Sequence, residues 1–225
     1  MNPVTVGCLL LSHNKPDTVM EALQSVYDQD YQHWKLVLID SGVLAPDLFP
    51  QIGDPRVQCV VSEETEEVRQ TVAVAPWCFN RYLPLLKTDL IVYLCDDDVW
   101  YPHAFRTFAT FMGRNPDIEA CYASQDFGFV RPGEPAVVTG ERIAREIGGH
   151  GFHPMDCRVD YLQLCHRRSL LSRMERPWWP EAGEHRSHSD GLFLEKIGRH
   201  CPIYPWPVKV SMNRRTVHSV HAPLR

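Results

Sequence analysis

The 225-residue sequence lacks several features that would place a protein in a familiar class. It has no excess of positive charge, because 23 lysines and arginines stand against 28 aspartates and glutamates, so no basic field indicates binding to nucleic acid. No apolar run approaches the roughly 18–20 residues that span a bilayer. No basic flank precedes the apolar stretch 4–11, so a signal-peptide layout is missing as well. We therefore expect a cytoplasmic protein without a transmembrane segment.

Cysteine pairs of the CxxC type are also absent. The eight cysteines are scattered, and several lie inside apolar runs, where a thiol acts as a small hydrophobic group. This spacing favours reduced, mostly buried thiols over disulfides or a zinc site. The sequence has no internal repeat, low-complexity tract or linker. A chain of this length predicts one domain with one sizeable core.

Three consecutive carboxylates form the most informative motif. Asp96, Asp97 and Asp98 directly follow the apolar run 90–95. Adjacent carboxylates repel one another and lose hydration near a protein, so their position at the end of a strand indicates a divalent cation. Mg2+ or Mn2+ typically uses one or two carboxylates together with substrate phosphates. The alternative is a solvated acidic turn in which Asp98 caps the next helix.

The apolar segments predict an α/β protein with a Rossmann-like, mostly parallel central sheet flanked by helices. Residues 4–11 and 34–39 have the continuous apolar character of buried parallel strands, and a helix with one apolar face is expected at 17–27. Such a unit forms a right-handed crossover. Because ligands bind beyond the carboxyl ends of parallel strands, Asp40 and the three carboxylates should share one cleft.

The rest of the chain continues this alternation. Further strands are expected at 57–61, 90–95, 120–123, 160–164 and 203–204. Further helical segments are expected at 78–86, 103–114, 168–174 and 191–198. The polar segment 131–157 contains several glycines, and this texture predicts a mobile loop.

Two stretches resemble family 2 glycosyltransferases with the GT-A fold. They are LLSHNKPDTVMEALQSVYDQDYQHWKLVLIDSG and NRYLPLLKTDLIVYLCDDDVWYP. Within this family the sequence is most similar to the glycosyltransferases of bacterial spore coat polysaccharide synthesis, and the similarity continues through LCHRRSLL, SDGLFLEKIGRHCPIYPW and SVH. The resemblance implies one GT-A domain over residues 1–225, with a nucleotide-sugar-binding half at about 1–100 and an acceptor-binding, catalytic half at about 101–225.

The resemblance also implies roles for residues of the first half. Ser12 and His13 match the loop that contacts the nucleotide base, and Asp40 matches the carboxylate that binds a uracil or thymine ring. Asp96 matches the ribose contact. Asp97 matches the ligand of a divalent cation, Mn2+ or Mg2+. In the same frame, Asp98 occupies a variable polar position, as a supporting or helix-capping group, and Cys95 stands where the family commonly has a further acidic residue.

The implied reaction transfers a sugar, with inversion, from a UDP- or dTDP-sugar to a hydroxyl acceptor, a glycan or a small molecule, in polysaccharide, glycoconjugate or natural-product synthesis. A base has to take the proton of the acceptor hydroxyl. Asp190 matches that carboxylate, with Glu184 as the alternative base, and Asp190 is also suited to cap the helix that follows. The segment 166–168 resembles a family segment at the acceptor side, so one of its side chains is expected to face substrate.

Residues near the C-terminus complete the implied site. His221 matches a histidine that completes the metal shell or meets the diphosphate, with His218 as the alternative. Arg214 is expected to hold the charge of the diphosphate, unless it is a solvated side chain. Trp178 and Trp179 have two possible roles, stacking on a sugar ring or packing of their own loop.

Two other functions fit parts of the pattern. A sugar nucleotidyltransferase holds its triphosphate on a glycine-rich, basic loop after the first strand, whereas residues 12–16 contain no glycine. A non-catalytic carbohydrate-binding module on the same fold would need neither Asp97 nor Asp190. The donor sugar, the acceptor and the oligomeric state cannot be read from the sequence.

Overall fold

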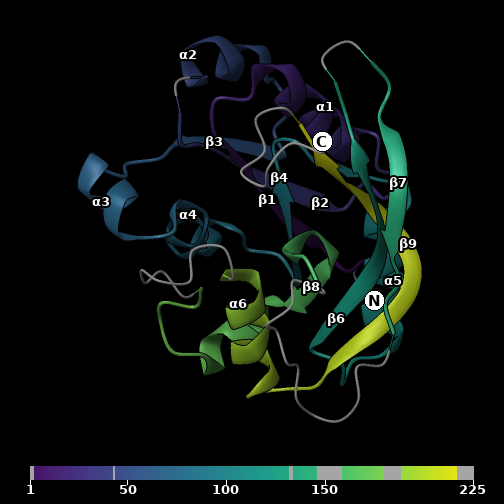
Figure 1. Cartoon of the computed structure of the whole chain (residues 1–225). Coiled ribbons are helices and arrows are strands. Elements are labelled where there is room, and N and C mark those ends of the chain that lie inside the picture. Colours follow the sequence, from purple (N-terminus) through teal and green to yellow (C-terminus); the bar gives the residue numbers. More distant parts are fainter. Residues whose placement is uncertain (1–2, 43, 132–133, 146–158, 180–188, 217–225) are drawn as a thin grey trace.

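The computed structural model describes residues 3–42, 44–131, 134–145, 159–179 and 189–216 (Figure 1). The strands are β1 (Val6–Ser12), β2 (Trp34–Asp40), β3 (Val57–Val61), β4 (Leu90–Cys95), β5 (Val99–Trp100), β6 (Ala120–Phe129), β7 (Val137–Arg142), β8 (Leu164–Arg167) and β9 (Ile203–Arg215). The α-helices are α1 (Pro16–Tyr27), α2 (Ala45–Leu48), α3 (Glu66–Thr71), α4 (Val74–Tyr82), α5 (Ala104–Arg114) and α6 (Ser189–Gly198). The 3-10 helices are η1 (Phe49–Gln51), η2 (Leu83–Leu85), η3 (Tyr161–Gln163) and η4 (Arg168–Arg173).

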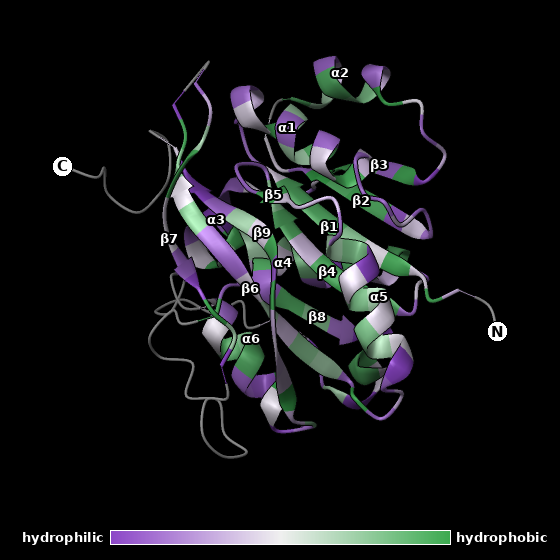
Figure 2. Cartoon of the chain, turned by 90° about the vertical axis from the view of Figure 1, so that its right-hand side faces the viewer, coloured by the Kyte–Doolittle hydropathy of each residue, from purple (hydrophilic) through white to green (hydrophobic). Residues whose placement is uncertain are grey.

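The first strand is buried along its whole length because helices cover both faces of the sheet. Its side chains alternate between the two faces, as the pleat of a strand requires. Cys8 and Leu10 join the apolar core that includes residues of α1 and α5. Leu9 and Leu11 join a second core that includes residues of α4 and α6. The continuous apolar character of this strand thus reflects two cores, one on each face of the sheet. Figure 2 shows that apolar residues are concentrated on β1, β2 and β4.

The described strands form one curled sheet in the order β3-β2-β1-β4-β8-β6-β9-β5, with β7 paired to β6. β3, β2, β1 and β4 are parallel to one another, as the sequence predicted. β8 then runs antiparallel between β4 and β6. β5 pairs antiparallel with β9, and β7 pairs antiparallel with β6. β6 and β9 are parallel and form the longest ladder. The sheet is therefore parallel in its first half and mixed in its second.

Three predictions about the second half were wrong in detail. Residues 137–142 lie in the segment that the sequence predicted as a loop, yet they form β7 with exposed valines; residues 146–158 of that segment lie outside the described residues. Residues 160–164 were predicted as a strand, but Asp160 forms a capping box with Gln163 and starts η3, so the strand begins at Leu164.

The strands β6 and β9 are also much longer than predicted. Pro205 and Pro207 interrupt the apolar alternation of β9, and its register against β6 shifts on either side of Ser124. Prolines inside a strand argue against a strand in sequence reasoning. In the structure the irregular ladder accommodates them. The extension carries Asn213 and Arg214 to the site described below.

Two expectations from composition can be compared with the described residues. The seven cysteines among them are all free, and most are buried, as expected. Among the helices that the structure describes, none is long and apolar enough to cross a membrane.

Candidate active site

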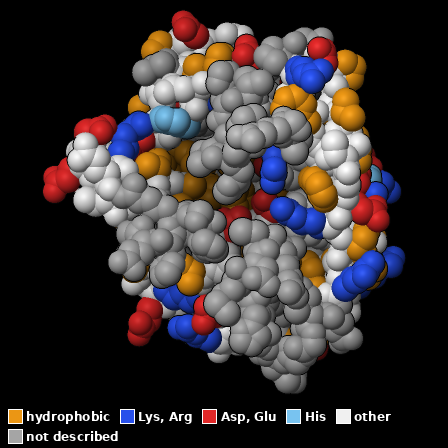
Figure 3. Space-filling model, viewed as in Figure 1, with side chains coloured by type: hydrophobic (Ala, Val, Ile, Leu, Met, Phe, Trp, Pro, Cys, Tyr) orange, Lys and Arg blue, Asp and Glu red, His pale blue; other side chains and the backbone are white. Residues whose placement is uncertain are grey.

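The parallel register brings the ends of three strands together. Ser12 at the end of β1 is aligned with Asp40 at the end of β2, and Leu11 is aligned with Cys95 at the end of β4. The three carboxylates follow in the turn between β4 and β5, where the main-chain N–H of Asp98 donates to the carbonyl of Cys95. Asp40 and the three carboxylates therefore lie at the same edge of the sheet, as expected from the sequence. Figure 3 shows acidic and basic side chains next to each other in a hollow at the centre of this face.

Asp96 is tied to the loop that follows β1. Its Oδ2 accepts the main-chain N–H of His13 at 2.7 Å and the hydroxyl of Ser12 at 3.4 Å. Burial raises the pKa of Asp96, although Lys15 and the N–H of His13 oppose the increase. The carboxylate therefore fixes the loop after β1 against the turn after β4.

The ammonium group of Lys15 lies between two of the carboxylates. Its Nζ is 3.1 Å from Oδ1 of Asp96 and 2.7 Å from Oδ2 of Asp97. Burial by itself would lower the pKa of Lys15, but the charges of Asp97 and Asp96 outweigh burial and raise it. The sequence analysis had not singled out this residue.

Asp98 does not cap a helix, because α5 begins only at Ala104. Its carboxylate accepts the main-chain N–H of Arg214 at 2.7 Å and Nδ2 of Asn213 at 3.3 Å. Burial, with the charges of Asp97 and Asp160, raises the pKa of Asp98 well above its usual value. Asp98 thus anchors the end of β9 to the acidic turn.

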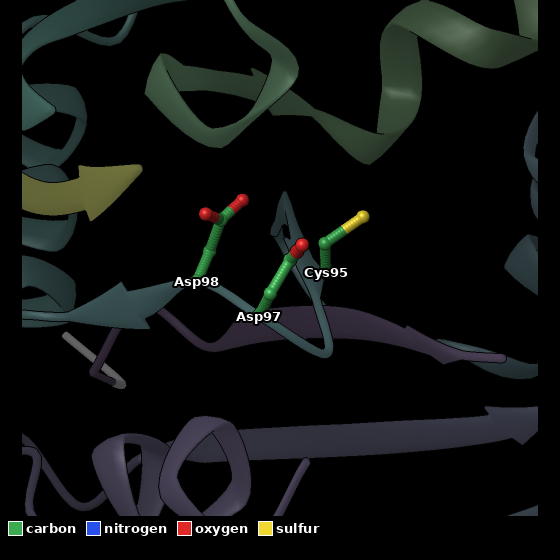
Figure 4. A group of neighbouring side chains, drawn as sticks. All are labelled: Cys95, Asp97 and Asp98. Carbon is green, nitrogen blue, oxygen red and sulfur yellow. The ribbon is translucent and has the colours of Figure 1, made fainter. Parts of the chain in front are cut away.

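Cys95, Asp97 and Asp98 form a group that could hold a metal ion (Figure 4). One potential ligand atom from each of them lies within 4.8 Å of the other two. Burial and the neighbouring carboxylates raise the pKa of the Cys95 thiol well above its usual value, so the thiol is protonated and is a poor ligand. The two carboxylates offer the oxygen donors that Mg2+ and Mn2+ prefer. This donor set therefore fits a hard divalent cation such as Mg2+ or Mn2+.

Arg214 reaches the same turn from β9. Its Nε donates to the main-chain carbonyl of Asp97 at 2.5 Å, and its Nη1 pairs with Glu21 of α1. Nη2 is buried and has no hydrogen-bond partner among the described residues. Arg214 is only 5% exposed, so the alternative of a solvated side chain was wrong. A buried guanidinium nitrogen with unused donors is suited to an anionic ligand.

A second group of carboxylates lies on the other side of Asp98. Asp160 is 3.5 Å from Nη1 of Arg142 and 3.3 Å from Nδ2 of Asn213. Burial is the main reason why the pKa of Asp160 is raised, and the charge of Asp97 adds to it. Neither Asp160 nor Arg142 was predicted, because they come from a 3-10 turn and from a strand that the sequence pattern did not indicate.

Asp190 lies in the first turn of α6, one residue after the helix begins at Ser189, so it is not the residue that caps the helix. Burial, and next the charge of Asp160, raise the pKa of Asp190 to about 8, against a main-chain N–H of Tyr161 that favours ionisation. A carboxyl group with such a pKa is a stronger base than an ordinary aspartate once it is ionised. The structure therefore places Asp190 close to Asp160, in an environment that raises its pKa.

The residues predicted to contact the nucleotide base lie at the carboxyl ends of β1 and β2. His13 is exposed, and its Nδ1 is 2.8 Å from the carbonyl of Ser41, which also accepts Nη2 of Arg69. Asp40 is fully buried, and its carboxylate accepts the main-chain N–H groups of Gly42 and Ala45. A contact between Asp40 and a base would require these bonds to be rearranged. Arg69, which sequence reasoning missed, lies at the same carbonyl as the imidazole.

Several predicted residues are elsewhere or outside the description. Trp178 and Trp179 are buried, and the ring of Trp179 stacks on Phe193 at 4.0 Å, so their role is packing and not sugar stacking. His166 is also buried, with Nε2 bonded to the hydroxyl of Tyr93, so it does not face substrate. The remaining candidates, Glu184, His218 and His221, lie outside the described residues.

The arrangement of this sheet, with an acidic turn after the fourth strand and a mixed second half, is that of the GT-A fold. TarS of S. aureus, solved as residues 1–349 in complex with UDP-GlcNAc, matches with a TM-score of 0.67 at 13% identity, over 98% of this chain and 62% of that one. The mannosyltransferase PcManGT from Pyrobaculum calidifontis, in complex with GDP-Man and Mn2+, matches with a TM-score of 0.62 at 15% identity, over 98% of this chain and 59% of that one.

A relative by sequence is Protein CgeD of Bacillus subtilis (strain 168), which is 26% identical over 206 residues, or 89% of this chain. The chain spans 47% of the length of that protein. No family model matches the sequence. The predicted fold is thus confirmed by the structural neighbours.

Proposed function

We propose that the chain is a metal-dependent, inverting glycosyltransferase that moves a sugar from a nucleoside-diphosphate donor to a hydroxyl acceptor. The observation that carries the proposal is the convergence of Asp96, Asp97, Asp98, Asp160 and Asp190 at the carboxyl edge of a GT-A sheet. Three of these carboxylates are buried and two are partly buried. Such a group is costly to keep together unless cations and protons are part of its function.

The first half of the chain would bind the donor. His13 and Ser12 lie at the end of β1, where a base and ribose would lie across the strand ends, and Asp96 is the carboxylate closest to them. Arg214 would hold the diphosphate through the guanidinium nitrogen that has no partner. Asp40 would position the loop after β2, with the contact to the base as a further role.

Asp97 would be the main protein ligand of the divalent cation, supported by Asp98. His221 or His218 would add a ligand from the C-terminal segment. A bound Mn2+ or Mg2+ would neutralise the charge that develops on the leaving diphosphate. Asp97 therefore has to stay oriented, and the hydrogen bond from Nε of Arg214 to the carbonyl oxygen of Asp97 fixes the main chain at this point.

The second half would bind the acceptor and supply the base. Asp190 would accept the proton of the acceptor hydroxyl while that oxygen attacks the anomeric carbon opposite the diphosphate. Its raised pKa follows from burial and from Asp160, and Arg142 holds Asp160 in place. On this proposal the whole chain is one catalytic domain with a donor half and an acceptor half.

A donor screen tests the proposal directly. The structural neighbours were solved with UDP-GlcNAc and with GDP-Man, so the screen should include UDP, dTDP and GDP together with their sugars. A cognate nucleoside diphosphate should raise the melting temperature much more with Mn2+ than with EDTA. The matching nucleotide sugar should release its diphosphate slowly in the presence of Mn2+.

The control is Asp97→Asn, which should lose the difference between Mn2+ and EDTA. If a nucleoside diphosphate stabilised the wild type equally in Mn2+ and in EDTA, Asp97 would not be the metal ligand. The absence of any response to all three nucleotides would favour a non-catalytic module on the same fold.

A further inference from the structure

Lys15 occupies a position that the proposed reaction does not explain. Its ammonium nitrogen lies 3.1 Å from Asp96 and 2.7 Å from Asp97, so one positive charge bridges the two carboxylates closest to the expected diphosphate. The side chain is 21% exposed, whereas those of Asp96 and Asp97 are 4% and 11% exposed. The ammonium therefore covers the carboxylates from the open side of the cleft.

The neighbouring cation does not take over this task. The Nε of Arg214 donates to the main-chain carbonyl of Asp97, and its Nη1 pairs with Glu21. These two donors are thus used on a neutral carbonyl and on a carboxylate outside the acidic turn. The observed contacts assign the compensation of Asp96 and Asp97 to Lys15.

The backbone of Lys15 is fixed, but its side chain is not. Asn14 has a positive φ of 56°, which turns the chain back over the strand ends, and Pro16 starts α1 directly afterwards. The carbonyl of Lys15 accepts the N–H of Val19 at 3.0 Å. The ammonium group itself sits at the tip of a flexible four-carbon stem. It can therefore leave the carboxylates by side-chain rotation, with the loop unchanged.

We propose that Lys15 is an internal cation that holds Asp96 and Asp97 together while no metal is present and is exchanged for the divalent cation when the donor binds. This inference rests on the proposed function, since it takes Asp97 to be the metal ligand. A divalent cation on Asp97 would lie at about 2.0–2.2 Å from a carboxylate oxygen, a few ångströms from the ammonium. Two positive charges so close repel each other, so the ammonium has to move.

The proposed exchange predicts that removal of the ammonium raises the affinity for the metal and lowers the stability of the metal-free protein. Lys15→Met removes the competing charge, so the variant should bind Mn2+ alone at least about tenfold more tightly than the wild type, as measured by titration of the Mn2+ EPR signal. The same variant should have a lower melting temperature in EDTA, because two buried carboxylates lose an ion-pair partner. An ordinary supporting residue would lower both the stability and the affinity for the metal.

Two variants serve as controls. Lys15→Arg keeps the positive charge and should bind Mn2+ about as weakly as the wild type. Lys35→Met removes an exposed lysine from β2 and should leave both the affinity and the melting temperature unchanged. Together they separate the local effect of the ammonium from a general change in net charge.

The failure of this inference can be told from the failure of the proposed function. If the wild type binds Mn2+ through Asp97 but Lys15→Met binds it equally or more weakly, the exchange is wrong and the metal site stands. If neither protein binds Mn2+, with or without UDP, dTDP or GDP, the proposed metal dependence fails and the exchange fails with it.

A measurement on the wild-type protein covers the case in which Lys15→Met does not fold. With 15N-labelled lysine, the Nζ resonance of an ion-paired ammonium is protected from exchange with water. Lys15→Arg identifies the resonance by its loss. Addition of Mg2+ with the cognate nucleoside diphosphate should abolish the protection of this one signal, and a resonance that stays protected would overturn the proposal.

Discussion

The carboxylates on the two sides of the acidic turn differ in how their charge is compensated. On the donor side, Asp96 and Asp97 contact the ammonium of Lys15 and the loop after β1 at 2.7–3.1 Å. On the acceptor side, Asp160 has an arginine at 3.5 Å and shares Asn213 with Asp98. Burial raises the pKa of Asp98 and of Asp190, and the charge of Asp160 adds to both increases. The proposed function would use the donor side to exchange cations and the acceptor side to hold and release protons.

The largest effect is expected from Asp190→Asn. An amide cannot accept the proton of the acceptor hydroxyl, so kcat should fall by about 10²–10⁴-fold, while binding of the nucleotide sugar and Mn2+, measured by calorimetry, should be unchanged. Glu195→Gln, which changes another carboxylate of α6 that pairs with Arg199 at the surface, is the matched control and should retain most of the activity. Turnover close to that of the wild type would remove Asp190 as the base.

Asp97→Asn should act on the other side of the turn. It replaces the main ligand of the cation, so the affinity for Mn2+ and the rate of transfer should both fall, the rate by about 10²–10³-fold. Calorimetric titration with Mn2+ and a steady-state assay measure the two quantities. Asp54→Asn removes a carboxylate paired with Arg56 away from the site and should change neither. If Asp97→Asn transferred sugar normally, the assignment of the donor side would be wrong.

Arg214→Met tests whether the unpartnered guanidinium nitrogen meets the diphosphate. A lost charge-assisted hydrogen bond corresponds to about 1.5–3 kcal/mol, so the affinity for the nucleoside diphosphate should fall by roughly tenfold or more. Arg215→Met, at an exposed position next to it, should leave the affinity unchanged. Equal losses in the two variants would indicate that a general loss of positive charge, and not a contact of Arg214, weakens binding.

The smallest effect is a displacement of the pH profile by Asp160→Asn. Asp190 is active as a base only when ionised, so with a pKa of about 8 the value of kcat/KM should rise with pH up to that range. The negative charge of Asp160 is one cause of the raised pKa. Its removal should lower the pKa of Asp190 and move the profile toward acid pH by about one unit. A shift toward alkaline pH would contradict the coupling.

Sequence reasoning worked well where one segment determines its own geometry. A buried strand such as β1 or β4 shows as a continuous apolar run, and the residue after it lies at the carboxyl edge by construction. Asp40 and Asp96 could therefore be assigned to one edge without a structure. The acidic turn, the first crossover helix and the order of the donor half follow from the same logic.

The acceptor half depends on contacts between distant segments. Arg142 comes from a strand with exposed valines, and Asp160 from a short 3-10 turn. Neither element has an apolar period that reveals it. Asn213 reaches the site because β9 continues past two prolines. For Trp179 the sequence left two roles open, sugar stacking or packing. Its burial against Phe193, a contact between distant segments, decides for packing.

Gly42 has no side chain that could bind a ligand, but its small size limits which residues evolution can accept at this position. A methyl group at this position would lie 2.3 Å from Oδ1 of Asn14, so even alanine would displace the residue next to Lys15. Adaptation of the donor site by substitution at position 42 is therefore coupled to the loop that carries the ammonium. We expect related sequences that replace Gly42 to replace Asn14 as well, so that these two positions covary.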